Sequence, residues 1–140
     1  MGGKKILVID DSQTVLEAVS IMLEDAGYEV LTLTDAALFA VTINRTKPDL
    51  ALVDVSMPVV VGQLLVGLAK RHHLHPCVIA LHSSQSEEKL RQLAAECGAD
   101  GYVSKTSDAN ELVAHVERLL RLAPKVTAGP GSPKLVPCPG

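Results

Sequence analysis

Five short apolar runs alternate with helical patterns along this 140-residue chain, and this alternation constrains the fold more than any other feature. The runs read ILVI, YEVLTL, DLALVD, CVIALHSS and GYVSK in chain order. Short apolar runs of this kind predict strands, and helices between them predict βαβ units. We therefore expect an α/β fold in which a five-stranded parallel sheet is doubly wound, with helices on both faces.

The segments between the runs carry helix signals. Ser12 is a natural N-cap, and apolar residues at helical spacing follow it until Gly27. The other helical patterns cover residues 35–46, 62–73, 86–98 and 107–122. Because 47% of the residues are apolar but only 2% are aromatic, the core must consist mainly of Val, Leu, Ile and Ala.

Charge and cysteine content exclude several classes of protein. A net charge of -3 argues against nucleic acid as a direct ligand. The odd number of cysteines (Cys77, Cys97 and Cys138) and their spacing favour a reduced protein without a structural metal, with Cys77 and Cys97 as small buried hydrophobes. No apolar run is long enough to span a membrane, and the stretch before Ile6 leaves no room for a signal peptide. We therefore expect a cytoplasmic protein without a membrane partner.

Composition changes abruptly after Leu122. Residues 123–140, APKVTAGPGSPKLVPCPG, are rich in Pro and Gly and cannot pack as a helix. We expect one domain over residues 4–122, followed by a flexible tail or linker over residues 123–140.

Polar residues stand where four of the predicted strands end. Asp10 and Asp11 follow the first run, Asp54 ends the third, Ser83 lies near the end of the fourth and Lys105 ends the fifth. The carboxyl ends of parallel strands meet at one edge of the sheet, where ligands of such folds bind. Clustered carboxylates at that edge suit Mg²⁺, and Asp54, which stands alone at its strand end, is the candidate nucleophile toward a phosphoryl group. Alternatively, each residue has only a local role. Asp10 and Asp11 would then cap the helix that follows the first strand, Ser83 would cap the helix that follows the fourth strand, and Lys105 would be a solvent-exposed lysine at the end of its strand.

With these residues in place, the sequence resembles the receiver domains of bacterial two-component response regulators from Lys4 to about Leu122. The motifs that carry the resemblance are VIDDS, LALVDVSMPVVVG, ALHSS and GADGYVSKT, in this order and spacing. The resemblance implies a chemotaxis-type, flavodoxin-like receiver with strand order 2-1-3-4-5.

The resemblance also implies a role for each matching residue. Asp54 becomes the phospho-acceptor, and Lys105 becomes the phosphate-binding lysine. Asp10 and Asp11 become the acidic pair that binds Mg²⁺ together with Asp54 and the backbone carbonyl of Ser56. Ser83 becomes the switch hydroxyl and Tyr102 the aromatic switch residue.

The function implied is a phosphorelay switch rather than a metabolic enzyme, catalysing only its own phosphotransfer and dephosphorylation. A histidine kinase or phosphotransfer protein would donate the phosphoryl group, and a downstream output protein would bind the last two helices and the fifth strand. One alternative is a pseudo-receiver that binds partners without phosphate. The other is an aspartate-dependent phosphatase of the haloacid dehalogenase type, which Ser56 disfavours because such enzymes carry a second acid at that position.

Two positions depart from the family pattern. Receivers usually have Lys-Pro with a cis bond after the fifth strand, whereas this chain has Lys105-Thr106, for which a cis bond would cost roughly 3 kcal/mol. We therefore expect a trans bond and a differently shaped loop. The loop after Asp54 carries Val59, Val60 and Val61 where an acid is usual, and these valines are either a partner contact or an inward-facing apolar loop.

The histidines have two interpretations each. His72, His73 and His75 could bind a metal, but we expect exposed residues at a helix C-terminus, where positive charge is favourable. His82, next to Ser83, could face the predicted site, but we expect a packed, neutral side chain.

Overall fold

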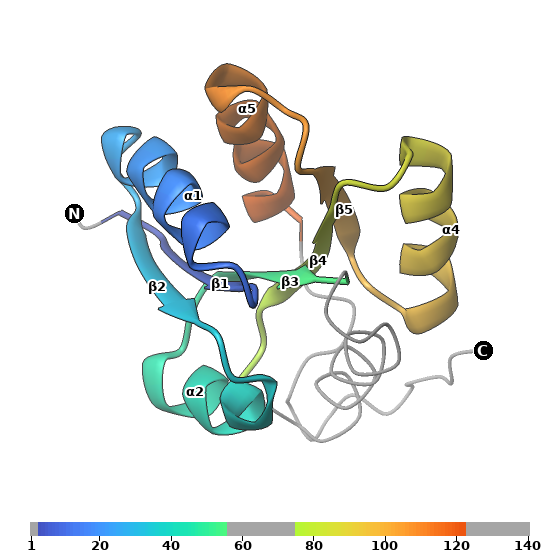
Figure 1. Ribbon diagram of the computed structural model, residues 1–140. Coiled ribbons are helices and arrows are strands. Elements are labelled where there is room, and N and C mark those ends of the chain that lie inside the picture. Colours follow the sequence, from blue (N-terminus) through green and yellow to red (C-terminus); the bar gives the residue numbers. More distant parts are fainter. Residues whose placement is uncertain (1–2, 56–74, 123–140) are drawn as a thin grey trace.

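The computed structural model describes residues 3–55 and 75–122 and has five parallel strands in the order β2-β1-β3-β4-β5 (Figure 1). This is the predicted fold class and the predicted strand order. The strands are β1 (Lys5–Ile9), β2 (Glu29–Leu33), β3 (Leu50–Asp54), β4 (Val78–Ser83) and β5 (Gly101–Ser104). The helices are α1 (Gln13–Asp25), the short 3₁₀ helix η1 (Ala36–Leu38), α2 (Phe39–Thr46), α4 (Glu87–Cys97) and α5 (Ala109–Leu120).

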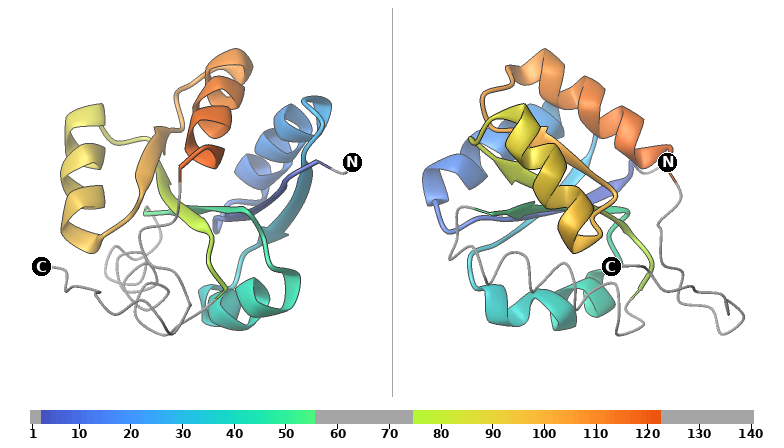
Figure 2. Two further views of the ribbon diagram at one scale, coloured as in Figure 1. Left: turned by 180° about the vertical axis from the view of Figure 1, so that it is seen from behind. Right: turned by 90° about the vertical axis from the view of Figure 1, so that its right-hand side faces the viewer.

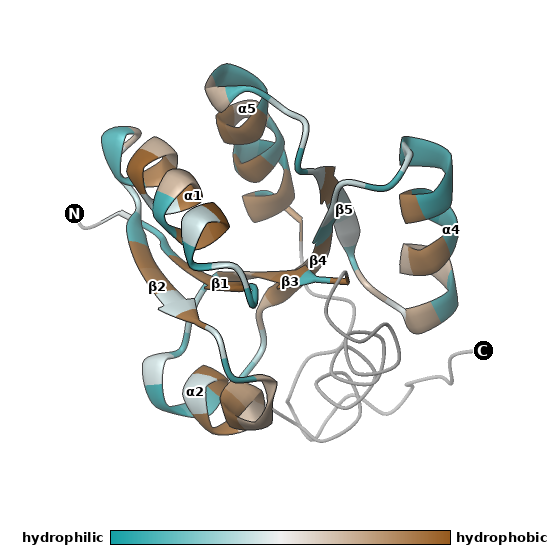
Figure 3. Cartoon of the chain, in the orientation of Figure 1, coloured by the Kyte–Doolittle hydropathy of each residue, from teal (hydrophilic) through white to brown (hydrophobic). Residues whose placement is uncertain are grey.

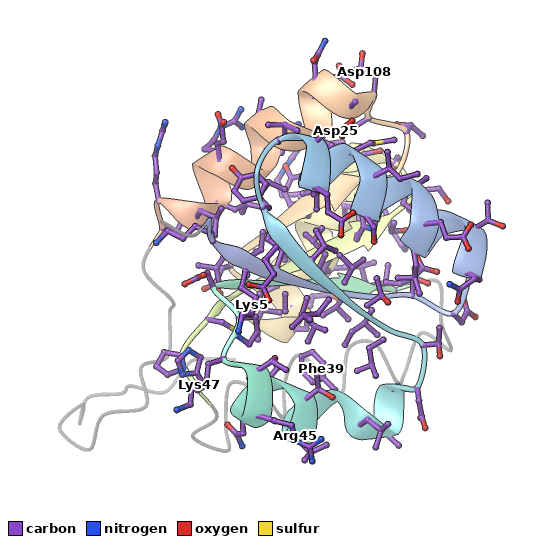
Figure 4. The ribbon with its side chains drawn as sticks, turned by 90° about the vertical axis from the view of Figure 1, so that its left-hand side faces the viewer. Lys5, Asp25, Phe39, Arg45, Lys47 and Asp108 are labelled. Atoms are coloured by element: carbon purple, nitrogen blue, oxygen red, sulfur yellow. The ribbon has the colours of Figure 1, made fainter. Side chains whose placement is uncertain are left out.

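Helices cover both faces of the sheet, as predicted, so the core has two layers. Alternate residues of β1, β3 and β4 point to opposite faces. On one face, Val8, Leu52 and Ala80 pack against buried residues of α1 and α5; on the other, side chains of the same strands pack against α2 and α4. Figure 2 shows α1 and α5 together on one side of the sheet, opposite α2. Apolar stripes on these helices turn towards the sheet in Figure 3, and Figure 4 shows Phe39 directed from α2 towards the sheet while Arg45 points away.

The helix boundaries agree with the cap signals in most places. Ser12 caps α1 through a hydrogen bond from the backbone N–H of Val15, and Gly98 ends α4 in the left-handed conformation at φ 81°. The predicted helix over residues 35–46 is in fact divided: Asp35 caps a 3₁₀ turn, and α2 begins only at Phe39. Such turns commonly tighten helix starts.

Several predictions concern residues outside the described part of the chain: the helix over residues 62–73, the valines at 59–61, and the tail over 123–140. Of the two cysteines predicted to be buried, Cys77 is buried, whereas Cys97 is only partly so and packs against the edge of the core. Within residues 3–55 and 75–122, the helices are too short or too polar to cross a membrane.

The close approach of β5 and α5 depends on Gly101. A Cβ atom at this position would lie 2.5 Å from the Leu119 side chain, which is buried. Gly101→Ala should therefore lower the free energy of unfolding by about 1–3 kcal/mol through overpacking. Urea unfolding tests this, with Gly101→Ala/Leu119→Ala as the companion variant. The double variant should lose less than the sum of the single losses, and simple additivity would show that the two groups do not compete for space.

Candidate functional site

The polar residues predicted to converge do meet at one edge of the sheet. The register pairs Ile9 with Val53 and Asp54 with His82, so the carboxyl ends of β1, β3 and β4 are level. Ser83 pairs with Ser104, which brings the loop after β5 to the same edge. Asp10 and Lys105 directly follow β1 and β5. The fold thus gathers side chains as far apart in sequence as Asp10 and Lys105, which lie near opposite ends of the domain.

Lys105 links the two buried carboxylates of the site. Its Nζ lies 2.7 Å from Asp10 Oδ2 and 3.0 Å from Asp54 Oδ1. Asp10 and Asp54 are both fully buried, whereas the Lys105 side chain is 16% exposed. This geometry contradicts the alternative in which Lys105 is merely solvated at the end of its strand.

Burial and charge act in opposite directions on these groups. Burial raises the pKa of Asp10, and the nearby charge of Asp54 adds to this, although Lys105 and the Ser12 N–H favour the carboxylate. Burial alone would lower the pKa of Lys105, but its hydrogen bonds to Asp10 and Asp54 outweigh burial and raise it. Lys105 therefore remains protonated and compensates negative charge that the fold has removed from water.

Asp10, Asp11 and Asp54 form a group of carboxylates suited to a small divalent cation. One oxygen from each lies within 4.8 Å of the others. Asp10 and Asp54 are buried, while Asp11 is exposed and leaves the group open on one side. Mg²⁺ prefers a few hard carboxylate oxygens and retains several waters, so this donor set fits it. Ser56, whose carbonyl is the remaining predicted ligand, lies outside the described residues.

Helix capping accounts for only part of the acidic pair. Asp10 Oδ1 accepts a hydrogen bond of 2.9 Å from the Ser12 N–H, but Ser12 itself caps α1. The other oxygen of Asp10 faces Lys105. Asp10 is thus both a local turn-former and a member of the charged cluster.

Ser83 and Tyr102 belong to the edge of the site nearest α4. Ser83 is fully buried, and its Oγ accepts a hydrogen bond of 3.1 Å from the Gln85 N–H in the turn before α4. The cap of α4 is Ser86. Tyr102 is partly buried against the core, and its hydroxyl lies 3.5 Å from Glu87 Oε2. Glu87 was not singled out in the sequence, since an acid in a helix's first turn is ordinarily explained by the helix dipole.

The loop after β5 has the predicted trans geometry. Among residues 3–55 and 75–122 no peptide bond is cis, so Lys105-Thr106 is trans. Hydroxyl groups hold the turn instead: Ser104 Oγ lies 2.7 Å from Thr106 Oγ1 and accepts the Thr106 N–H at 3.1 Å. This local turn directs Lys105 towards Asp10 and Asp54 without proline.

His82 is packed and neutral, as expected. It is 2% exposed, and burial lowers its pKa to about 4, aided by the positive charge of Lys105 and opposed by Asp54. It borders a cavity of about 120 Å³ between α1 and α5. Of the other three histidines predicted near a helix end, His72 and His73 lie outside the described residues, and His75 is partly buried.

Comparison with known proteins shows which family the chain belongs to. The sequence profile described as "Response regulator receiver domain" matches residues 6–117. The chain is 34% identical over 134 residues to the phosphate regulon transcriptional regulatory protein PhoB of Pseudomonas aeruginosa, covering 94% of this chain and 56% of that protein. It is 33% identical over 120 residues to the alkaline phosphatase synthesis transcriptional regulatory protein PhoP of Bacillus subtilis, covering 85% of this chain and 49% of that protein. The chain thus spans about half the length of the curated relatives it matches.

Solved structures show the same relationship. The chemotaxis response regulator CheY4 of Vibrio cholerae superimposes with a TM-score of 0.72 at 28% identity, over 84% of this chain and 98% of that one. A putative response regulator from Chloroflexus aurantiacus gives a TM-score of 0.76 at 27% identity, over 86% of this chain and 99% of that one. The match to the family profile, the sequence identity to the curated relatives and the shared fold together show that this chain belongs to the response regulator receiver domain family of two-component signalling.

Proposed function

We propose that this chain is a phosphorylation-dependent switch that accepts a phosphoryl group on Asp54 and then changes its affinity for an output protein. The donor is a histidine kinase or a phosphotransfer protein, in keeping with the signalling role of the family. The observation that carries the proposal is the buried Asp54 carboxylate, which has Lys105 Nζ at 3.0 Å and carboxylate oxygens of Asp10 and Asp11 within 4.8 Å.

In the proposed transfer, an Asp54 carboxylate oxygen bonds to phosphorus as the bond from phosphorus to the donor histidine nitrogen breaks. The histidine nitrogen leaves with the bonding electron pair, and Asp54 becomes an acyl phosphate. Bound Mg²⁺, held by Asp10, Asp11 and Asp54, would supply positive charge to the phosphoryl oxygens. The Lys105 ammonium stabilises the same developing charge from its position beside Asp54.

The rest of the switch lies beside the acyl phosphate. The new phosphoryl oxygens are strong acceptors and draw the Ser83 hydroxyl inward, away from the Gln85 N–H that it now contacts. The surface formed by α4, β5 and α5 then changes its arrangement and its affinity for an output protein. We further propose that residues 4–122 are the complete switching unit and that residues 123–140 are a tail or linker.

Phosphodonor labelling tests the proposal directly. With acetyl phosphate and Mg²⁺, intact-mass measurement should show one added phosphoryl group on the wild type and on Asp35→Asn, a control at an exposed carboxylate that caps η1. Asp54→Asn should not label, and a chelator should abolish wild-type labelling, because unneutralised carboxylates repel the incoming phosphate. If neither acetyl phosphate nor a phosphohistidine protein labels the wild type in Mg²⁺, the chain is instead a phosphate-independent interaction module.

Ser83→Ala separates acceptance from switching. This variant should still be labelled, because Asp54 and Lys105 are intact. Labelling should change backbone hydrogen exchange in α4, β5 and α5 of the wild type but not of the variant. An equal change in both proteins would exclude Ser83 from the switch.

A further inference from the structure

The Tyr102 side chain shares a face of the sheet with Ser83 and lies next to α4. In the register of β4 with β5, Leu81 pairs with Tyr102 and Ser83 with Ser104. Side chains alternate along a strand, so Leu81 and Ser83 point to the same face, and both Leu81 and Tyr102 belong to the core on the α4 side. Tyr102 therefore lies on the same face as Ser83, two residues along β5 from Ser104, the partner of Ser83.

A short chain of contacts connects Ser83 to the Tyr102 hydroxyl through α4. Ser83 Oγ accepts the Gln85 N–H at 3.1 Å, which shapes the turn that leads into α4. Ser86 caps the helix, and Glu87 is its first residue. The Tyr102 hydroxyl donates to Glu87 Oε2 at 3.5 Å. Only three residues separate Ser83 from Glu87, so the turn transmits a displacement of Ser83 to Glu87 over a short distance.

Arg91 lies one helical turn beyond Glu87 and completes the surroundings of the phenol. The pKa of Arg91 is raised, first by its hydrogen bond to Tyr102 and further by the charges of Glu87 and Glu88. Glu87 and Arg91 thus present an acceptor and a donor to one hydroxyl from the same side of α4. Both groups favour the position of Tyr102 against α4 over one nearer Ser83.

We propose that Glu87 is a positioning residue that holds the Tyr102 hydroxyl against α4 until Ser83 leaves Gln85. This inference deepens the proposed function and rests on it, because phosphorylation of Asp54 is what moves Ser83. When the bond between Ser83 and the Gln85 N–H breaks, the turn before α4 loosens, Glu87 shifts, and Tyr102 loses its acceptor. Tyr102 then becomes able to leave its place beside α4.

The chain has no tryptophan and two tyrosines, which makes the position of Tyr102 measurable. In a Tyr28→Phe background, Tyr102 is the one remaining tyrosine, and acrylamide quenching of its fluorescence reports its exposure. Without any phosphodonor, Glu87→Ala should lower the quenching constant about twofold, since the ring loses its hydrogen bond to a carboxylate and also occupies the more buried position nearer Ser83. Glu87→Gln keeps an acceptor oxygen and should restore most of the wild-type value.

Glu88→Ala is the matched control, because it removes the same charge from the first turn of α4 next to Glu87. It should leave quenching unchanged even if the thermal midpoint falls as much as in Glu87→Ala. Equal quenching in the Glu87→Ala and Glu88→Ala proteins would overturn the role of Glu87. If that occurs while Asp54 still labels, only this inference fails; if Asp54 does not label, the proposed function itself fails.

The release step has its own measurement. Labelling Asp54 in the Tyr28→Phe protein should change Tyr102 quenching, and Glu87→Ala should remove at least half of that change, because the contact to be released is already absent. A labelling-induced change of equal size in both proteins would show that Tyr102 responds independently of Glu87.

Discussion

Lys105→Met should lower the free energy of unfolding by about 3–5 kcal/mol at neutral pH, since it leaves buried negative charge without its cation. Methionine keeps the length of the stem but removes the ammonium that contacts Asp10 at 2.7 Å and Asp54 at 3.0 Å. Both carboxylates are fully buried, so water compensates poorly for the lost partner. Urea unfolding at neutral pH measures the loss. Lys89→Met, at an exposed lysine of α4, is the control and should stay within about 0.5 kcal/mol of wild type.

The loss should shrink in acid. The pKa of Asp10 is already raised by burial, and removing Lys105 takes away a group that favours the charged form. Asp10 therefore becomes neutral more readily in the variant, and a neutral carboxyl needs no cation. Excess Mg²⁺ at neutral pH should restore part of the stability, because binding to the folded state stabilises it. A loss that is the same in acid and at neutral pH, or below about 1 kcal/mol, would contradict a charge-based role for Lys105.

Acidification should destabilise the wild-type protein through His82. Its pKa is about 4 in the folded protein against 6.5 for an ordinary histidine, so the unfolded state binds the proton more readily. The contribution to stability is complete above pH 6.5 and is lost as the pH falls towards about 4. The total is about 3 kcal/mol, from 1.36 kcal/mol for each pH unit.

His82→Leu tests this assignment. Leucine suits the apolar walls that α1 and α5 contribute beside His82, and it cannot titrate. We expect little loss at neutral pH and a much flatter pH dependence above about pH 4. Asp10 acts in the opposite direction, because its raised pKa gives stability that is present in acid and lost as the pH rises. In His82→Leu, where His82 no longer titrates, the dependence of the unfolding free energy on pH should show this contribution of Asp10. His115→Gln, which removes a histidine from α5, is the control and should keep the wild-type dependence of stability on pH. If His82→Leu also keeps that dependence, a group other than His82 is responsible for it.

Much of the fold was predictable because local patterns and global packing agree. Buried runs such as ILVI have no polar face, so they must lie inside a sheet covered on both sides, and capped amphipathic segments must supply the cover. Parallel strands connected by helices also place their carboxyl ends at one edge. That rule alone is sufficient to predict that Asp10, Asp54, Ser83 and Lys105 come together. The roles of these residues remain predictions until labelling tests them.

By itself, the sequence determined the strands, the edge where they end and the residue types gathered there, because apolar periodicity and capping act over a few neighbouring residues. Only the tertiary structure decided that Lys105 contacts both buried carboxylates, that Ser104 and Thr106 shape its loop without proline, and that Tyr102 meets Glu87. Such contacts depend on differences of an ångström between side chains that are distant in sequence. Periodicity carries no information at that scale, whereas strand register and helix packing do.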